Sequence, residues 1–166
     1  MKIFLIYFLL FLSIVFFSYN ELTPSLKTPE VWWDEALIGT MTIELVNNLH
    51  TGYCFDFLGR HFPLGSGLQH GALECYILAP FILLGGTTTE ALRIGPILFG
   101  VAEIILTYWL ACRLFNPYVG ILSAILLAIN SFYISVIKEG GVCGFSLPFF
   151  SMLSLSLFLK YDSYIL

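Results

Sequence analysis

Charged side chains are scarce in this sequence: Asp, Glu, Lys and Arg make up 11% of the 166 residues, whereas hydrophobic residues make up 58%. The seven Lys and Arg are scattered along the chain, and the net charge is -4. So few separated cations form no basic patch for a nucleic-acid backbone, which excludes a nucleic-acid role. The mean hydropathy of +0.90 lies outside the range of soluble domains and predicts a membrane protein.

Cysteine patterning is also lacking. The four cysteines include no C-x-x-C pair, and no two histidines stand three or four residues apart. This absence argues against a zinc site and against a dense disulfide framework. Cys54 and Cys75 would pair if both faced an oxidising compartment, although a free buried cysteine is the commoner state.

Long hydrophobic runs are what the sequence does contain. Residues 3–19 form an apolar run behind Lys2, and its end lacks the small-x-small pattern of a cleaved signal peptide, so we predict an uncleaved first span. Three later runs have the length and composition of further spans: 94–114, 119–137 and 144–160. The apolar stretch 72–86 is short and interrupted by Pro80, which predicts an interfacial or re-entrant helix.

Basic residues near the predicted spans set their orientation. If 72–86 does not cross the membrane, Lys2, Arg113 and Lys160 lie on one side, which the positive-inside rule makes the inner side. Counting 72–86 as a fifth span gives a mixed pattern, so charge favours four spans. The predicted fold is therefore an all-α membrane module of about four transmembrane helices. Residues 20–93 form its long outer loop, which carries interfacial amphipathic helices.

Two adjacent acids follow two tryptophans in Trp32-Trp33-Asp34-Glu35. The residues after them predict an amphipathic helix over 36–49 that lies on the membrane, with an apolar face of Leu37, Met41, Leu45 and Leu49. Asp34 then falls in the first turn, where unpaired N–H groups and the helix dipole favour a negative charge. An ionised carboxylate there can act as a base. The simpler alternative is that Asp34 caps the helix and Glu35 is a solvated acid.

Cations and histidines share the predicted outer surface with these acids. Arg93 is a candidate phosphate partner because guanidinium binds phosphate oxygens in pairs; the alternative is an arginine that snorkels at the membrane boundary. Lys138 is a second candidate for binding the phosphate.

The segment 48–71 contains five glycines and is predicted to be loop. Three further residues are candidate contacts to substrate or to a metal ion, with backbone-bonded loop histidines as the alternative: His61, His70 and Glu139.

The order of these elements is similar to that of a known family. The chain has a first span, an acidic pair opening a helix, His61-Phe62-Pro63-Leu64, a His-Gly element followed by Tyr76, and Ala91-Leu92-Arg93 opening the next span. This order resembles the amino-terminal part of GT-C glycosyltransferases. Within them it resembles family 39, the dolichyl-phosphate-mannose protein mannosyltransferases and the aminoarabinose transferase of lipid A. The resemblance implies Asp34 as catalytic base, with Glu35 beside it, and Arg93 as the arginine of the following span.

We therefore predict a hexosyltransferase module that moves a sugar from a polyprenyl-phosphate-linked donor to a hydroxyl of a lipid or protein acceptor. Such a transfer needs a base for the acceptor proton and cations for the departing phosphate. The module is expected in the plasma or inner membrane, with its active face extracytoplasmic. The chain, residues 1–166, is predicted to be the amino-terminal fragment of a larger protein and is expected to be inactive alone. The sequence does not identify a cofactor, and a divalent metal ion is one option.

Two functions of other classes remain as alternatives. A small transporter or channel is suggested by Glu103, which lies in the middle of a predicted span, where carboxylates often belong to ion paths. A neutral, hydrogen-bonded Glu103 is the simpler explanation. A non-catalytic assembly subunit is suggested by the small residues Gly120, Ala124 and Ala128 on one helix face. Charge gathered in one outer loop favours the glycosyltransferase over both.

The flanking charges predict that residues 20–90 lie outside and Arg113 inside. In variants that keep one cysteine each, a membrane-impermeant maleimide added outside intact cells should label a cysteine placed within 20–90 and should not label the Arg113→Cys position. Labelling of position 113 from the outside contradicts the four-span model and makes 72–86 a true span.

Overall fold

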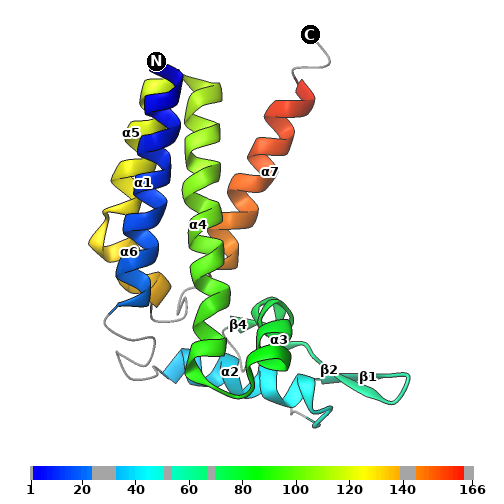
Figure 1. Cartoon of the computed structure of the whole chain (residues 1–166). Coiled ribbons are helices and arrows are strands. Elements are labelled where there is room, and N and C mark those ends of the chain that lie inside the picture. Colours follow the sequence, from blue (N-terminus) through cyan, green and yellow to red (C-terminus); the bar gives the residue numbers. More distant parts are fainter. Residues whose placement is uncertain (1, 24–32, 51–53, 67–69, 139–144, 163–166) are drawn as a thin grey trace.

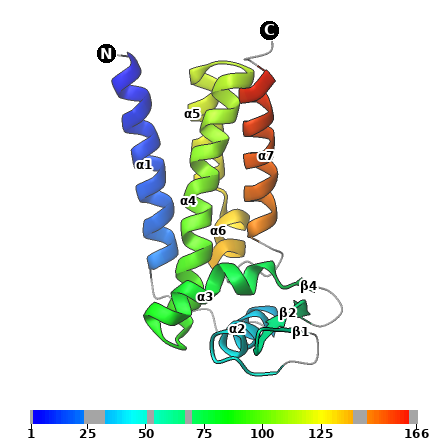
Figure 2. The same cartoon turned by 90° about the vertical axis from the view of Figure 1, so that its right-hand side faces the viewer.

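The computed structural model describes residues 2–23, 33–50, 54–66, 70–138 and 145–162. Its long helices form an upright bundle, and its other elements form a layer across one end of that bundle (Figure 1 and Figure 2). The bundle contains α1 (Lys2–Leu22), α4 (Thr89–Leu114), α5 (Pro117–Ala128), α6 (Ser131–Lys138) and α7 (Ser146–Asp162). The end layer consists of α2 (Trp33–Val46), α3 (Leu73–Gly85) and four short strands.

Helix α4 is the centre of the bundle, since it packs against α1, α5, α6, α7 and α3. The buried core runs from the bundle into the end layer: Phe17, Ile38, Met41, Cys75, Leu78, Ile97, Ile104, Ala124, Ala128, Ile137 and Phe145. Among the described residues, α4 and the Ile3–Leu22 part of α1 are long and apolar enough to cross a membrane. The bent pair of α5 and α6 makes a third span if counted as one, and α7 is a shorter apolar helix. The all-α membrane fold is confirmed, and the number of four spans stays a prediction.

The stretch 119–137, predicted as a span, is divided between two helices in the structure. Helix α5 ends at Ala128, α6 begins at Ser131, and the two are bent by 57°. Asn130 stands at the break, where its side-chain oxygen accepts a hydrogen bond from the N–H of Tyr133 at 3.0 Å in the manner of an N-cap. A hydropathy window averages over one such residue, so the sequence did not reveal the break. Together α5 and α6 still have the length and composition of a span, which stays a prediction.

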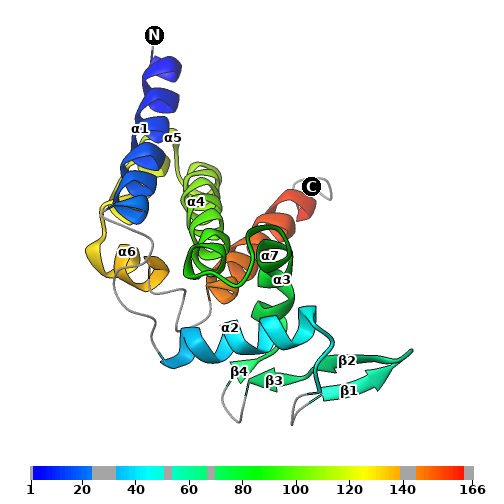
Figure 3. The same cartoon turned by 60° about the horizontal axis from the view of Figure 1, so that its bottom comes forward.

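Two antiparallel hairpins occupy part of the segment predicted to be loop (Figure 3). β1 (Cys54–Phe57) pairs with β2 (Arg60–Pro63), and β3 (Gly65–Ser66) pairs with β4 (His70–Gly71). The turn residues Leu58 and Gly59 both have positive φ, 48° and 75°, as a two-residue type I′ turn requires. The loop prediction is wrong here because the glycine content concealed the alternation of the first hairpin.

Helix α2 buries a face different from the predicted one. Its buried residues are Glu35, Ile38, Gly39, Met41 and Thr42, so Met41 alone of the predicted apolar face is buried. A Cβ at Gly39 would lie 2.8 Å from Cδ1 of Leu92, which shows how closely α4 approaches this face. The predicted face is wrong because contacts to distant residues, rather than the spacing of leucines, orient the helix.

The described cysteines are Cys54, Cys75 and Cys112, and none of these three forms a disulfide. Cys75 is buried on α3, and this burial raises the pKa of its thiol to about 11. A thiol with that pKa stays protonated near neutral pH, and the thiolate is the form that attacks electrophiles and binds metals. Cys75 is therefore a core residue.

The small residues that suggested a partner surface pack inside the chain. Gly120, Ala124 and Ala128 are buried on α5, which packs against α1 and α4. A Cβ at Gly120 would overlap Sγ of Cys112 and would lie 2.9 Å from the carbonyl oxygen of Tyr108. This face of α5 is therefore occupied by α4 within the chain. The small residues no longer support the alternative of a non-catalytic assembly subunit.

We expect Gly120→Val to destabilise the bundle, because overpacking a tight contact against backbone costs about 1–3 kcal/mol. The measurement is the apparent melting temperature of the detergent-purified protein. Gly71→Val is the matched control, because a Cβ at Gly71 meets nothing within 4 Å. Equal melting temperatures for Gly120→Val and the wild type would contradict the packing of α4 on α5.

Candidate functional site

Asp34 and Glu35 both lie in the first turn of α2, as the sequence predicted. Neighbouring residues of a helix point about 100° apart, so the two carboxylates face different surroundings. Glu35 is only 3% exposed, whereas Asp34 is half-buried. The adjacent acids therefore separate into an inward-facing and a more accessible carboxylate.

Glu35 forms a buried, bidentate ion pair with Arg93 of α4. Nε of Arg93 lies 2.7 Å from Oε1 of Glu35, and its Nη2 lies 2.9 Å from Oε2. The Arg93 side chain is 0% exposed. A buried charge is tolerated only when an opposite charge and hydrogen bonds compensate for the lost water, and this two-bond geometry provides both. The pair joins residues 58 positions apart and attaches the start of α2 to α4.

This ion pair bears on two sequence predictions. The structure does not support Glu35 as a solvated acid, because both of its carboxylate oxygens bind Arg93. Arg93 was predicted to contact the donor phosphate, and it is instead bound by Glu35 inside the protein. Its contact with phosphate stays a prediction. Asp34, the neighbour of Glu35, is the acid of the pair that lies nearer to solvent.

Helix α3 braces the end layer through two polar contacts that the sequence did not reveal. The hydroxyl of Tyr76 donates a hydrogen bond to the carbonyl of Pro63 at 2.7 Å, which ties α3 to β2. Burial raises the pKa of this tyrosine, so it remains a donor. Glu74 is buried on α3, and its Oε1 accepts a longer hydrogen bond of 3.4 Å from Ser146 of α7. The one sequence feature that could have indicated the contact of Glu74 is its position as an acid near the start of an otherwise apolar stretch.

Lys138 lies at the end of α6 and binds the carboxyl-terminal end of α1. Its Nζ donates to the carbonyl oxygen of Thr23 at 2.8 Å and to that of Asn20 at 3.3 Å. A cation at this position satisfies carbonyls that have no partner in the last helical turn and opposes the helix dipole. The contact of Lys138 with phosphate stays a prediction. The hydrogen bonds that Lys138 makes in the structure join α6 to α1.

Of the three predicted substrate or metal contacts, two have side chains outside the described part of the structure. His61 lies on β2, with its Nδ1 2.5 Å from Oδ1 of Asp56. His70 lies in β4, and its side chain is outside the described part. Glu139 also lies outside the described residues, as does Trp32. Of the three, only His61 therefore has described surroundings.

A shallow cavity of about 160 Å³ lies along one face of α2, lined by Trp33, Ala36, Leu37 and Thr40. Trp33 is 80% exposed at its edge. Small-molecule sites typically measure about 300–1,000 Å³, so this face alone does not enclose a sugar phosphate. Its apolar lining beside the acidic first turn is compatible with a surface that meets lipid.

Comparison with known protein families identifies a match over the second half of the chain. The family model described as dolichyl-phosphate-mannose-protein mannosyltransferase matches residues 69–163, more than half of the chain. No curated protein and no solved structure matches significantly. The matched range contains α3 to α7, and with them Arg93 and Lys138, and it begins after α2.

The buried ion pair predicts strong coupling between its two residues. Glu35→Gln or Arg93→Met alone should lower the free energy of unfolding by about 3–5 kcal/mol, because each leaves an uncompensated buried charge. The double variant should lose much less than the sum. The measurement is unfolding of the detergent-purified protein by added denaturing detergent.

Glu44→Gln serves as the control, since Glu44 is a half-buried acid of the same helix with no ion pair within the described residues. Single variants that behave like this control, or losses that simply add, would argue against the pair.

Proposed function

The chain belongs to the dolichyl-phosphate-mannose-protein mannosyltransferase family, and from this membership we propose that it transfers a sugar from a polyprenyl-phosphate-linked donor to an acceptor hydroxyl. The family makes it a membrane glycosyltransferase. The donor class and the hydroxyl acceptor, on a lipid or a protein, are the proposed part. The observation that most directly supports this proposal is that Glu35 is paired with Arg93, whereas the neighbouring Asp34 is more accessible.

In the proposed reaction Asp34 takes the proton of the acceptor hydroxyl. The hydroxyl oxygen then attacks the anomeric carbon, the bond from that carbon to phosphate oxygen breaks, and the polyprenyl phosphate leaves. Asp34 suits this role because the first turn of a helix attracts negative charge and because its side chain is half-buried. A general base works only when it is held in place relative to the proton it removes.

The Glu35–Arg93 pair supplies that placement in our proposal. Since Glu35 is adjacent to Asp34 and bound to α4, the backbone of the first turn is fixed relative to the bundle. Arg93 acts as a positioning residue in this arrangement. We keep Arg93 and Lys138 as proposed partners of the departing phosphate, because guanidinium and ammonium groups stabilise such charge.

We further propose that the end layer faces the extracytoplasmic side of the plasma or inner membrane. Helix α1 begins, and α4 and α7 end, at the bundle end opposite this layer (Figure 1 and Figure 2). Arg113 and Lys160 lie in the last turns of α4 and α7, and α1 begins at Lys2. Three basic residues at one end favour the cytoplasm for that end by the positive-inside rule.

The transporter alternative receives no specific support. Glu103 of α4 is 1% exposed, and its Oε2 accepts a hydrogen bond from the hydroxyl of Tyr133 at 2.8 Å. An intramembrane carboxylate that bonds a neighbouring helix has a structural role available to it. This contact pairs one carboxylate oxygen of Glu103 within the bundle, and the other oxygen is buried without a hydrogen-bond partner among the described residues.

Asp34→Asn tests the proposed base in the full-length protein. Asn keeps the shape of the Asp side chain and loses only the charge that the helix dipole favours by about 0.3–1 kcal/mol, so folding should survive. Mannose transfer from dolichyl-phosphate mannose should fall by about a hundred- to ten-thousand-fold. Glu44→Gln, a change on the same helix, should retain activity. Near wild-type turnover of a well-expressed Asp34→Asn protein would leave Asp34 with only a structural role in the first turn of α2. A loss seen only in a correctly folded Glu35→Gln protein would transfer the chemistry to Glu35.

A further inference from the structure

The hairpin of β1 and β2 places three metal-binding side chains on one of its faces. Residues two apart in a strand point to the same side, so Cys54 and Asp56 share a face. Asp56 is the register partner of His61, and opposite residues of an antiparallel pair also share a face. The Leu58-Gly59 turn fixes this register through its two positive φ angles.

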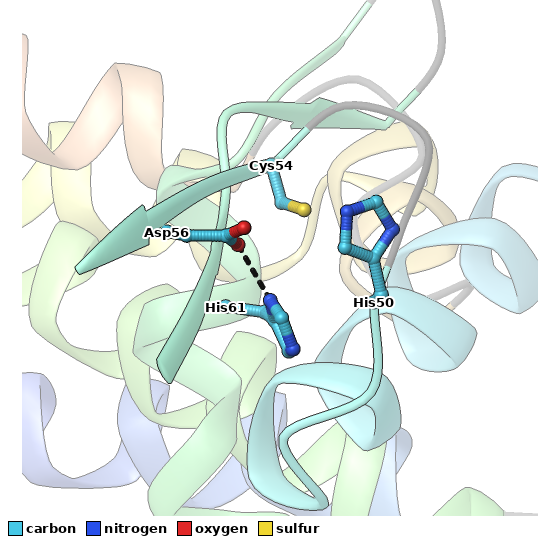
Figure 4. A group of neighbouring side chains, drawn as sticks. All are labelled: His50, Cys54, Asp56 and His61. Atoms are coloured by element: carbon cyan, nitrogen blue, oxygen red, sulfur yellow. Dashed lines mark hydrogen bonds and ion pairs between the residues drawn. The ribbon is translucent and has the colours of Figure 1, made fainter. Parts of the chain in front are cut away.

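His50 joins them from the segment that follows α2. The link is Asn48, which has a positive φ of 56° and turns the chain back toward the hairpin. Its Oδ1 accepts the backbone N–H of His61 at 2.9 Å, and its Nδ2 donates to the carbonyl of Gly59 at 3.2 Å. The rings of His50 and His61 consequently lie 5.0 Å apart between centroids (Figure 4).

We propose that His50, Cys54, Asp56 and His61 form a zinc site. One ligand atom from each of the four lies within 4.8 Å of the others. Tetrahedral zinc with bonds of about 2.0–2.3 Å requires ligand atoms about 3.3–3.8 Å apart, so a shift of about 1 Å closes the site. The side chains of His61 and Asp56 are 27% and 62% exposed, which leaves the ion a path of entry.

The chemistry of the four ligand side chains indicates which metal ion would bind. Two imidazoles and a thiolate are soft or borderline ligands that favour zinc over magnesium and calcium, which prefer oxygen ligands alone. Asp56 supplies the fourth ligand and exchanges its hydrogen bond with His61 for the metal. The sequence concealed this site because His-x-x-x-Cys-x-Asp-x-x-x-x-His matches neither helical nor zinc-finger spacing.

The proposed ion has a structural role distinct from sugar transfer. It would join the segment after α2 to both strands of the hairpin, and so add a metal link to the two hydrogen bonds of Asn48. Because metal binding to residues from separate segments is coupled to their folding, the bound ion should stabilise the end layer. None of the four residues is part of the proposed base or of its ion pair.

Cobalt binding to the full chain in detergent, after removal of metals by a chelator, tests the proposal. One equivalent of Co²⁺ should bind per chain and give a thiolate-to-cobalt charge-transfer band together with the visible bands of tetrahedral cobalt, and Zn²⁺ should displace it. Zn²⁺ should also raise the apparent melting temperature. Cys54→Ser should abolish the charge-transfer band, whereas Cys112→Ser, a matched thiol outside the cluster, should keep it.

The histidines provide the second comparison. His50→Ala and His61→Ala should each weaken Zn²⁺ binding by more than the roughly ten- to hundredfold that loss of an outer-shell partner causes. His70→Ala should bind as the wild type does. The proposal is overturned if the wild type shows no charge-transfer band, if Cys54→Ser retains it, or if His50→Ala binds normally. His50 lies outside the strands, so its variant tests the site even if a hairpin variant fails to fold.

Discussion

The buried ion pair between Glu35 and Arg93 is the contact on which the end layer depends. Neither charge has water to solvate it, so each is stable only while the other is in place. The geometry requires α2 to start against α4 with Glu35 inward, which sends Asp34 toward a more accessible position. The same contact orients the rest of α2, because a helix that is fixed in its first turn has little freedom to rotate.

Several polar side chains of the bundle form hydrogen bonds inside it, as a membrane environment favours. Tyr133 bonds Glu103 between α6 and α4, and Lys138 binds the last carbonyls of α1. Apolar side chains cover the outside of α1, where Phe4 is 77% exposed. An apolar exterior and hydrogen bonds between neighbouring helices are expected of helices surrounded by lipid.

Helix α2 separates two kinds of chemistry in the end layer. Its 14 residues span about 20 Å, with the acidic first turn at one end and the His50, Cys54, Asp56 and His61 group beyond the other. The acidic end is fixed by α4 and the far end by the hairpin through Asn48. Sugar transfer and metal binding, as proposed, therefore occupy opposite ends of one short helix that is held at both.

The sequence by itself determined the membrane class, the first and central spans, the short apolar helix at 72–86 and the family, because hydropathy and the order of elements are summed over many residues. It also located the start of α2. Only the tertiary structure decided that Glu35 binds Arg93, that Asn130 breaks a span, that α2 buries the face of Ile38, and that His50 meets His61. Each of these depends on a contact, a cap or a register involving particular atoms, which a local sequence pattern does not contain.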